Sequence, residues 1–173
     1  PEDDDERLDA MSCLASALSG SRDYAAALPL KEELLAVDRR TLGELDENTL
    51  VAIFNLANLH AIMGNPRLAL PLAEECLRGR RQTLGEEDEH TLTATRQLSD
   101  VHCDMDNYDA ALPLARRALE AQRRTLGNEH SDTQISINHF ADILDKQGDK
   151  EEALPLYEED LLLTRRTNGS EHP

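Results

Sequence analysis

The sequence predicts an all-α protein, a right-handed superhelical α-solenoid of four antiparallel helix pairs. The first reason is the tripeptide Thr-Leu-Gly, which begins at Thr41, Thr83 and Thr125, each copy 42 residues after the last. The second is Ala-Leu-Pro-Leu, which keeps the same step at 27–30, 69–72, 111–114 and 153–156. A fixed period of this size indicates copies of one supersecondary unit, which must stack to bury their apolar faces.

The composition favours helices over sheets. Hydrophobic residues make up 39% of the chain but aromatic residues only 3%, so leucine and alanine must fill the interior, which suits close helix–helix contact. The period divides the chain into an acidic N-terminal segment and four repeats, at 1–6, 7–48, 49–90, 91–132 and 133–173. Ser170 to Pro173 are expected to begin a fifth linker, so the sequence reads as an excerpt of a longer array.

Each repeat predicts two helices. In the second repeat, apolar residues at helical spacing run from Leu50 to Leu59 and stop at Gly64. Asn65 is expected to cap the next helix, which ends before Gly85. First helices are therefore expected at 7–20, 49–63, 91–105 and 133–147, and second helices at 24–41, 66–83, 108–125 and 150–166. The expected caps of the second helices are Asp23, Asn65, Asn107 and Asp149.

Positions 42 residues apart occupy the same place in each repeat, and we call such a set a column. One column places Pro29, Pro71, Pro113 and Pro155 about six residues into the second helices, where proline removes a hydrogen bond. Either the resulting kink is part of the unit or the first turn is loose, and the sequence leaves both open. A second column, Leu56, Leu98 and Phe140, is expected to be buried between helices.

An arginine column closes the second helices at Arg39, Arg81, Arg123 and Arg165. Positive charge there complements the helix macrodipole, and the acidic linkers offer partners for it. The alternative is that these arginines bind an acidic partner.

The net charge of −17 limits the choice of partners. Such a surface repels nucleic acid and anionic lipid and attracts basic peptides, although it also keeps a leucine-rich chain in solution. No run of 18 apolar residues occurs, so no membrane insertion is expected. Three cysteines, Cys13, Cys76 and Cys103, make an odd count typical of reduced thiols, which predicts a cytoplasmic location.

No enzyme activity, cofactor or metal site is expected. The sequence has no glycine-rich phosphate loop, nucleophile elbow or His-Glu-x-x-His motif. His102 and Cys103 are adjacent, so they point in different directions around a helix and form a poor zinc pair. His60 and His102 share a column with Leu18 and Leu144 and are expected to pack between helices.

Small residues at Ala57 and Ala69 within two antiparallel helices make the unit similar to the tetratricopeptide repeat. The 42-residue length, the segments Phe54-Asn55-Leu56-Ala57 and Asn138-His139-Phe140-Ala141, and the linker at 126–130 resemble the kinesin light chain class. The resemblance covers residues 7–173.

This resemblance implies that first helices line a concave groove that holds a partner peptide, and that second helices form the convex back. The family's groove columns fall here on Ser12, Cys13, Ser16, Phe54, Asn55, Asn58, Arg96, Gln97, Asp100, Asn138, His139 and Asp142, with Asp104 and Asp145 one turn further on. Only Asn55 and Asn138 keep the family's paired asparagines, so the ligand is expected to differ from that of kinesin light chains.

Two functions therefore remain open from the sequence. One is a non-catalytic interaction module whose groove binds a flexible basic segment that carries lysine or arginine. The other is a structural subunit held in a larger assembly through its convex face or its ends.

Overall fold

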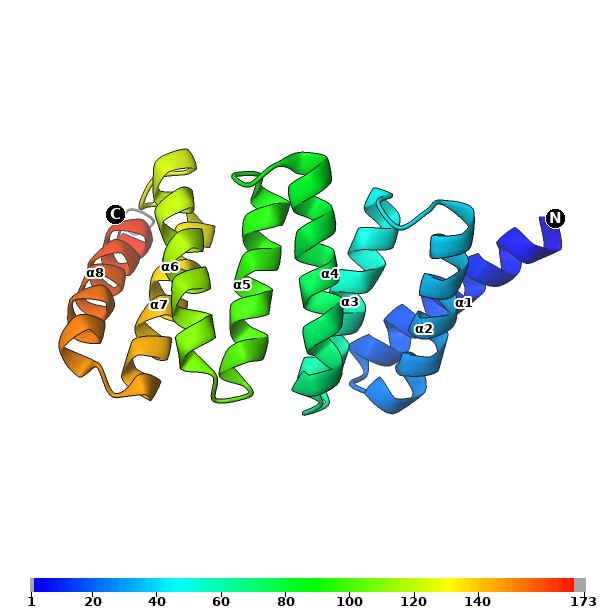
Figure 1. The fold of residues 1–173 in the computed structure, drawn as a ribbon, viewed down its shortest axis with the longest axis horizontal. Coiled ribbons are helices and arrows are strands. Elements are labelled where there is room, and N and C mark those ends of the chain that lie inside the picture. The colour runs from blue at the N-terminus through cyan, green and yellow to red at the C-terminus, as the bar shows by residue number, and fades with distance from the viewer. Residues whose placement is uncertain (1, 170–173) are drawn as a thin grey trace. The chain divides into compact units, whose positions relative to one another are not determined.

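The structure, a computed structural model, describes the backbone of residues 2–169 and the side chains of residues 6–166. Within this range the chain is entirely helical, without strands (Figure 1). The helices are α1 (Glu2–Gly20), α2 (Tyr24–Thr41), α3 (Glu47–Ile62), α4 (Pro66–Leu84), α5 (Glu89–Cys103), α6 (Tyr108–Thr125), α7 (Ser131–Gln147) and α8 (Lys150–Gly169). The predicted all-α fold is confirmed. The fifth linker expected at 170–173 lies outside the described residues.

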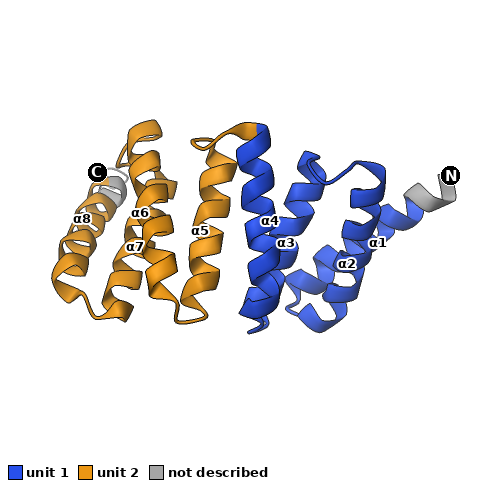
Figure 2. Ribbon diagram, viewed as in Figure 1, with its two compact units in different colours: residues 1–83 blue, residues 84–173 orange. Residues whose placement is uncertain are grey.

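The helices form two compact units, residues 1–83 and residues 84–173 (Figure 2). In unit 1, α2 packs against both α1 and α3. In unit 2, α6 packs against α5 and α7, and α8 packs against α7. Within each unit the helices thus pack in chain order, as a helical repeat array requires.

Three first helices begin two residues earlier than the sequence predicted. Asp46 and Asp88 each accept a hydrogen bond from the backbone N–H two residues on, at 2.9 Å. His130 does the same through its Nδ1 atom, at 3.2 Å. These side chains satisfy an N–H group that has no partner inside the helix, so α3, α5 and α7 start directly after them. Helix α1 also starts early, at Glu2, and includes the segment that was expected to stand apart.

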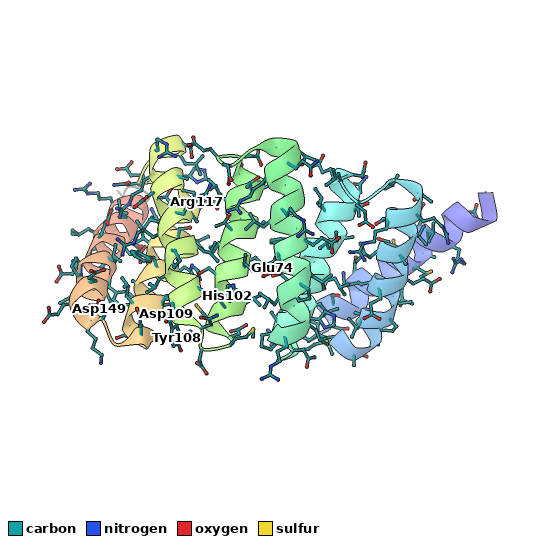
Figure 3. The ribbon with its side chains drawn as sticks, in the orientation of Figure 1. Glu74, His102, Tyr108, Asp109, Arg117 and Asp149 are labelled. Atoms are coloured by element: carbon teal, nitrogen blue, oxygen red, sulfur yellow. The ribbon has the colours of Figure 1, made fainter. Side chains whose placement is uncertain are left out.

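The expected caps of the second helices are partly realised. Asp23 accepts from the backbone N–H of Ala26 at 3.2 Å, and Asp149, at the start of α8 (Figure 3), accepts from that of Glu152 at 3.4 Å. The side chain of Asn107 makes no capping hydrogen bond. The backbone carbonyls of Asn65 and Asn107 each accept from residues three and four positions on, so both helices still close their first turn.

The second helices continue through their internal prolines. All four prolines are exposed, and so are the residues four positions before them, Ala25, Arg67, Asp109 and Glu151. Proline deprives the carbonyl at that earlier position of its helical partner. Because this carbonyl lies on an exposed face, water can hydrogen-bond to it, and the helix tolerates the proline.

Buried leucine and alanine hold each unit together. Leu56, Leu98 and Phe140 are 4%, 7% and 7% exposed, which confirms the column expected to be buried. The core of unit 2 combines Ala111, Ala115 and Leu119 of α6 with Ile137, Phe140, Ile143 and Leu144 of α7 and Ala153 and Leu163 of α8. No helix within residues 2–169 combines the length and the hydropathy needed to span a bilayer.

Helices α3 and α4 are in close contact at Gly79. A Cβ atom at this position would overlap the buried side chain of Leu50. One turn earlier on α4, the Sγ atom of Cys76 lies 3.5 Å from the backbone carbonyl oxygen of Leu50. Only glycine leaves room for Leu50 here.

Polar contacts at the surface of unit 2 connect α6 to the segment that precedes α5 and to α7. Arg117 of α6 pairs with Glu86 at 2.7 Å, and Asp109, at the start of the same helix, accepts from the Nε2 atom of Gln147 at 3.3 Å (Figure 3).

Candidate functional site

In unit 1, several of the residues that the sequence placed in a groove line one open hollow of about 330 Å³ between α1, α2 and α3. Ser12 and Ser16 come from α1, and Asn55 comes from α3. Helix α2 adds the ammonium group of Lys31 and the carboxyl group of Asp38. The other lining residues are Leu8, Asp9, Leu34, Asn48, Val51 and Ala52.

The residues that line the hollow include apolar side chains together with side chains of both charges. Burial, and then the nearby carboxylate of Asp46, raise the pKa of Asp38. Lys31, with no ion pair among the described residues, lies on the same wall. Together with the amides of Asn48 and Asn55, these groups can donate and accept hydrogen bonds toward a polar chain.

The other predicted residues of α3 are less open. The ring of Phe54 lies beneath the guanidinium group of the buried Arg80 on α4, at 4.8 Å from the ring centroid. Asn58 is half-buried, whereas Asn55 is exposed. In this helix, Asn55 is therefore the side chain best placed to meet a ligand.

In unit 2, the carboxylate of Asp100 already has two nitrogen partners. It lies 3.3 Å from Arg96 one turn earlier on α5 and 2.7 Å from the Nε2 atom of His139 on α7. The second contact brings α5 and α7 together at the predicted surface. Protonation of His139 would make it an ion pair.

Three further carboxylates, Asp104, Asp142 and Asp145, are exposed around this contact. Burial, and then repulsion from Asp100, raise the pKa of Asp104. Burial is also the main cause that raises the pKa of the Cys103 thiol to about 11, with Asp100 and Asp104 adding to it. Lys146 of α7 opposes both shifts. The negative charge here exceeds the positive charge beside it.

Two predicted residues differ in their access to a ligand. Asn138 is half-buried on α7. Gln97 is only 4% exposed, because it lies on the same face of α5 as the buried Ala94 and Val101, and it offers no open surface to a ligand. The paired-residue pattern alone could not reveal this, since Asn55 in the same column is exposed.

Sequence reasoning missed Lys31 and Tyr157, which share a column with Ala73 and Ala115. Tyr157 of α8 donates a hydrogen bond from its hydroxyl to the Oδ1 atom of Asp142 at 2.6 Å. Both residues lie on second helices yet reach groups predicted on first helices. Their departure from alanine within the repeat was the signal that could have identified them.

Several of the remaining histidines and cysteines lie at packing positions. His60 is buried and His102 is half-buried. Cys76 is buried, Cys103 is half-buried and Cys13 is exposed, and all three are free thiols. Within the described residues, no three histidine, cysteine, aspartate or glutamate side chains cluster so that they could hold a metal ion.

The chain is similar in fold to several solved structures. It superposes on a kinesin light chain-like protein of Podospora anserina with nearly identical repeats, with a TM-score of 0.83, 23% identity, and coverage of 94% of this chain and 76% of that one. BtubC (BKLC) from P. vanneervenii gives a TM-score of 0.84 at 17% identity, covering 96% of this chain and 66% of that one. MamA from Desulfovibrio magneticus RS-1 gives 0.69 at 14% identity, covering 92% and 76%.

No protein with a curated description matches the sequence significantly. The family model of the tetratricopeptide repeat, however, matches residues 6–82 and 90–159, which is most of the chain. This family consists generally of protein–protein interaction modules and is usually non-catalytic. With its helices packed in chain order and its kinesin light chain-like structural neighbours, the chain belongs to the tetratricopeptide repeat family.

Proposed function

We propose that the chain is a non-catalytic protein–protein interaction module whose first helices bind a flexible, basic segment of a partner protein. The observation that carries the proposal is a group of three exposed carboxylates, Asp104 at the C-terminal end of α5 and Asp142 and Asp145 on α7. Arg96 lies beside Asp100, and Lys146 acts on Asp104, so these carboxylates outnumber the positive charges near them.

Electrostatics favours a basic ligand at this surface. The raised pKa values of Asp104 and Cys103 reflect partial burial and repulsion between like charges. A lysine or arginine side chain from a partner would relieve that repulsion. The net charge of −17 would also speed the encounter with a basic segment.

The hollow of unit 1 suits the backbone of such a segment. Asn55 and Asn48 each carry a donor and an acceptor, so they can bind an extended main chain without reading its sequence. Asp9 and Asp38 supply negative charge on the same walls.

The first experiment measures binding of a short, flexible lysine-rich peptide by fluorescence anisotropy, with a glutamate-rich peptide of equal length as its control. The lysine-rich peptide should bind, and its affinity should fall as salt is added, mainly through a slower association rate. Replacing both Asp142 and Asp145 with asparagine should weaken binding about threefold to tenfold.

The matched control replaces two exposed acids on second helices of the same unit, Glu120→Gln with Glu158→Gln. It removes the same net charge from a different surface and should leave most of the affinity intact. If both double variants lost the same amount of affinity, net charge alone would explain the effect. Preference for the acidic peptide would contradict the proposal.

A second experiment tests the amides. The double variant Asn55→Ala with Asn138→Ala should keep most of its thermal stability, because Asn55 is exposed and Asn138 is only half-buried, and surface substitutions usually change stability by about 0.5 kcal/mol or less. Peptide affinity should fall by about 1 kcal/mol for each hydrogen bond lost. A structural subunit held through its convex face or ends predicts no change in its assembly. Unchanged peptide binding would show that the ligand binds to a surface other than the one formed by the first helices.

A further inference from the structure

The hollow of unit 1 is open at a place where the equivalent residues of unit 2 are in contact. In unit 2, the Nε2 atom of His139 on α7 lies 2.7 Å from the carboxylate of Asp100 on α5. The equivalent residues two repeats earlier are Asn55 on α3 and Ser16 on α1, and both line the hollow of about 330 Å³. Each is shorter than its equivalent, and no hydrogen bond joins these two described side chains. The space between α1 and α3 is therefore accessible to a ligand.

The two charged residues that α2 contributes to the hollow lack a partner among the described side chains. Lys31 and Asp38 are both half-buried, and neither makes an ion pair or a side-chain hydrogen bond within residues 6–166. Lys31 stands in the column of the buried Ala73 and Ala115, and Asp38 in the column of the buried Gln122. A charge that is partly removed from water without a partner costs free energy, and burial accordingly raises the pKa of Asp38. A ligand with opposite charges would recover that free energy.

Helix geometry holds these two charges apart on one wall of the hollow. Lys31 and Asp38 are seven residues apart, which is nearly two full turns, so both lie on the same side of α2. The rise of about 1.5 Å per residue separates them by about 10.5 Å along the helix axis. They do not form the ion pair that charges three or four residues apart form on a helix. The wall thus offers one positive and one negative group at a fixed spacing.

We propose that the hollow of unit 1 binds an extended partner segment that carries an acidic and a basic side chain three residues apart, with the acid at Lys31 and the base at Asp38. This inference deepens the proposed function and rests on one part of it, the binding of an extended segment by the first helices. In the polyproline II conformation, side chains three residues apart lie on the same face, about 9 Å from each other, which matches the spacing of the two charges. This conformation also leaves backbone groups free to bind the amides of Asn48 and Asn55.

The test compares three peptides of identical length and composition, each with one glutamate and one lysine in an alanine- and proline-rich background. Two of the peptides place these residues three apart, one in each order, because the direction of the segment decides which order fits. The third peptide places them next to each other. By fluorescence anisotropy with the 1–173 chain, one of the first two should bind about threefold to fivefold more tightly than the third. If the third peptide bound as tightly as the better of the other two, the proposal would be wrong.

Two double variants test the residues themselves. Lys31→Ala with Asp38→Gln introduces the residues that the third repeat carries at these positions, Ala115 and Gln122, so the fold should be kept. This variant should lose the preference for the three-residue spacing. Lys31→Glu with Asp38→Lys exchanges the two charges and should reverse the preferred order of glutamate and lysine. An exchanged variant that folds and still prefers the original order would overturn the proposal.

The matched control is Arg67→Ala with Glu74→Gln on α4 (Figure 3). These two residues are exposed, oppositely charged and also seven apart, but neither lines the hollow. The control should keep the preference of the wild type. Circular dichroism of every variant checks that helix content is kept. If the exchanged variant did not fold, the alanine–glutamine variant and the three peptides on the wild type would still decide the outcome.

The lysine-rich peptide described above separates this inference from the proposed function. Lys31→Ala with Asp38→Gln leaves the net charge and the carboxylates of unit 2 unchanged, so that peptide should bind this variant as it binds the wild type. If the lysine-rich peptide bound but spacing had no effect, the inference about unit 1 would fail and the basic-segment module would stand. If the wild type preferred the three-residue spacing but did not bind the lysine-rich peptide, the choice of a basic segment would be wrong and the hollow would keep its assignment.

Discussion

At the scale of single residues, comparing the repeats identifies a strained backbone conformation at Arg22. Its column holds glycine in two repeats, Gly64 and Gly148, with φ values of 74° and 100°. Arg22 and Asp106 occupy the same column with φ values of 62° and 56°. This left-handed region costs a residue with a Cβ atom about 1 kcal/mol, whereas glycine enters it freely.

Arg22→Gly should therefore raise the free energy of unfolding by about 0.5–1 kcal/mol, as measured by urea denaturation. The side chain of Arg22 is exposed and makes no hydrogen bond or ion pair with the described residues that would be lost. Arg22→Ala is the control, because it removes the same side chain but keeps the Cβ atom. If alanine stabilised the protein as much as glycine, the side chain rather than the backbone would be the cause.

A second residue-scale prediction concerns Tyr157. Its hydrogen bond to Asp142, followed by partial burial, raises the pKa of the phenol from 10.0 to about 12. The folded state thus favours the neutral phenol. The stabilisation is complete below pH 10 and is lost as the pH rises from about 10 to about 12.

Absorbance of the phenolate during a pH titration measures this. Asp142→Asn should bring the pKa of Tyr157 back toward 10, and Tyr157→Phe identifies its step by removing it. The pKa of Tyr108 is also raised, through its hydrogen bond to Asp106, so its step must stay unchanged in both variants. If the pKa of Tyr157 were the same in Asp142→Asn as in the wild type, the hydrogen bond to Asp142 would not be the cause of the shift.

At the scale of the elements, the contact of α3 with α4 depends on the absence of a side chain at Gly79. Replacing glycine with alanine inside a helix normally gains about 0.5–1 kcal/mol. Here the new Cβ atom would overlap Leu50, which is 3% exposed and has little room to move. Overpacking of this kind costs about 1–3 kcal/mol, so Gly79→Ala should destabilise the protein by about 1 kcal/mol.

Two comparisons separate overpacking from other causes. Gly20→Ala adds the same atom where nothing lies within 4 Å, and it should not destabilise the chain. In a Leu50→Ala background, Gly79→Ala should become neutral or stabilising, because the overlapping side chain is gone. A loss that persists in that background would place the cause outside this contact.

The elements also show what the sequence could predict. Columns of leucine, proline and glycine located every helix, and the stop before Gly85 is confirmed because α4 ends at Leu84. The starts of α3 and α5 were wrong by two residues because their caps, Asp46 and Asp88, were taken for parts of an acidic linker. Capping depends on one side-chain hydrogen bond, which apolar periodicity does not report.

The candidate surface was less predictable than the fold. The resemblance supplied only first-helix columns, so Lys31 and Tyr157 of the second helices were missed. Gln97 was assigned to an open surface although it is 4% exposed. Side-chain exposure depends on what packs against each repeat, and a column shared by four repeats does not contain that information. The association of the first helices with a ligand remains a proposal.

At the scale of the whole molecule, the division into two compact units makes a prediction about cooperativity. In a repeat array each element is stabilised by its neighbours, so damage stays local unless the coupling between units is strong. Leu56 of unit 1 and Leu98 of unit 2 share a column and are similarly buried, at 4% and 7% exposure. Truncating either to alanine should cost about 2–5 kcal/mol in its own unit.

Amide hydrogen exchange shows whether stability is lost in one unit or in both. Leu56→Ala should speed exchange in α1 to α4 and leave α5 to α8 largely protected, and Leu98→Ala should do the reverse. Each variant is the control for the other, because both remove the same atoms from the same column. Equal acceleration across all helices in both variants would mean that the two units unfold as one. A loss below about 0.5 kcal/mol in both would contradict the burial of the column itself.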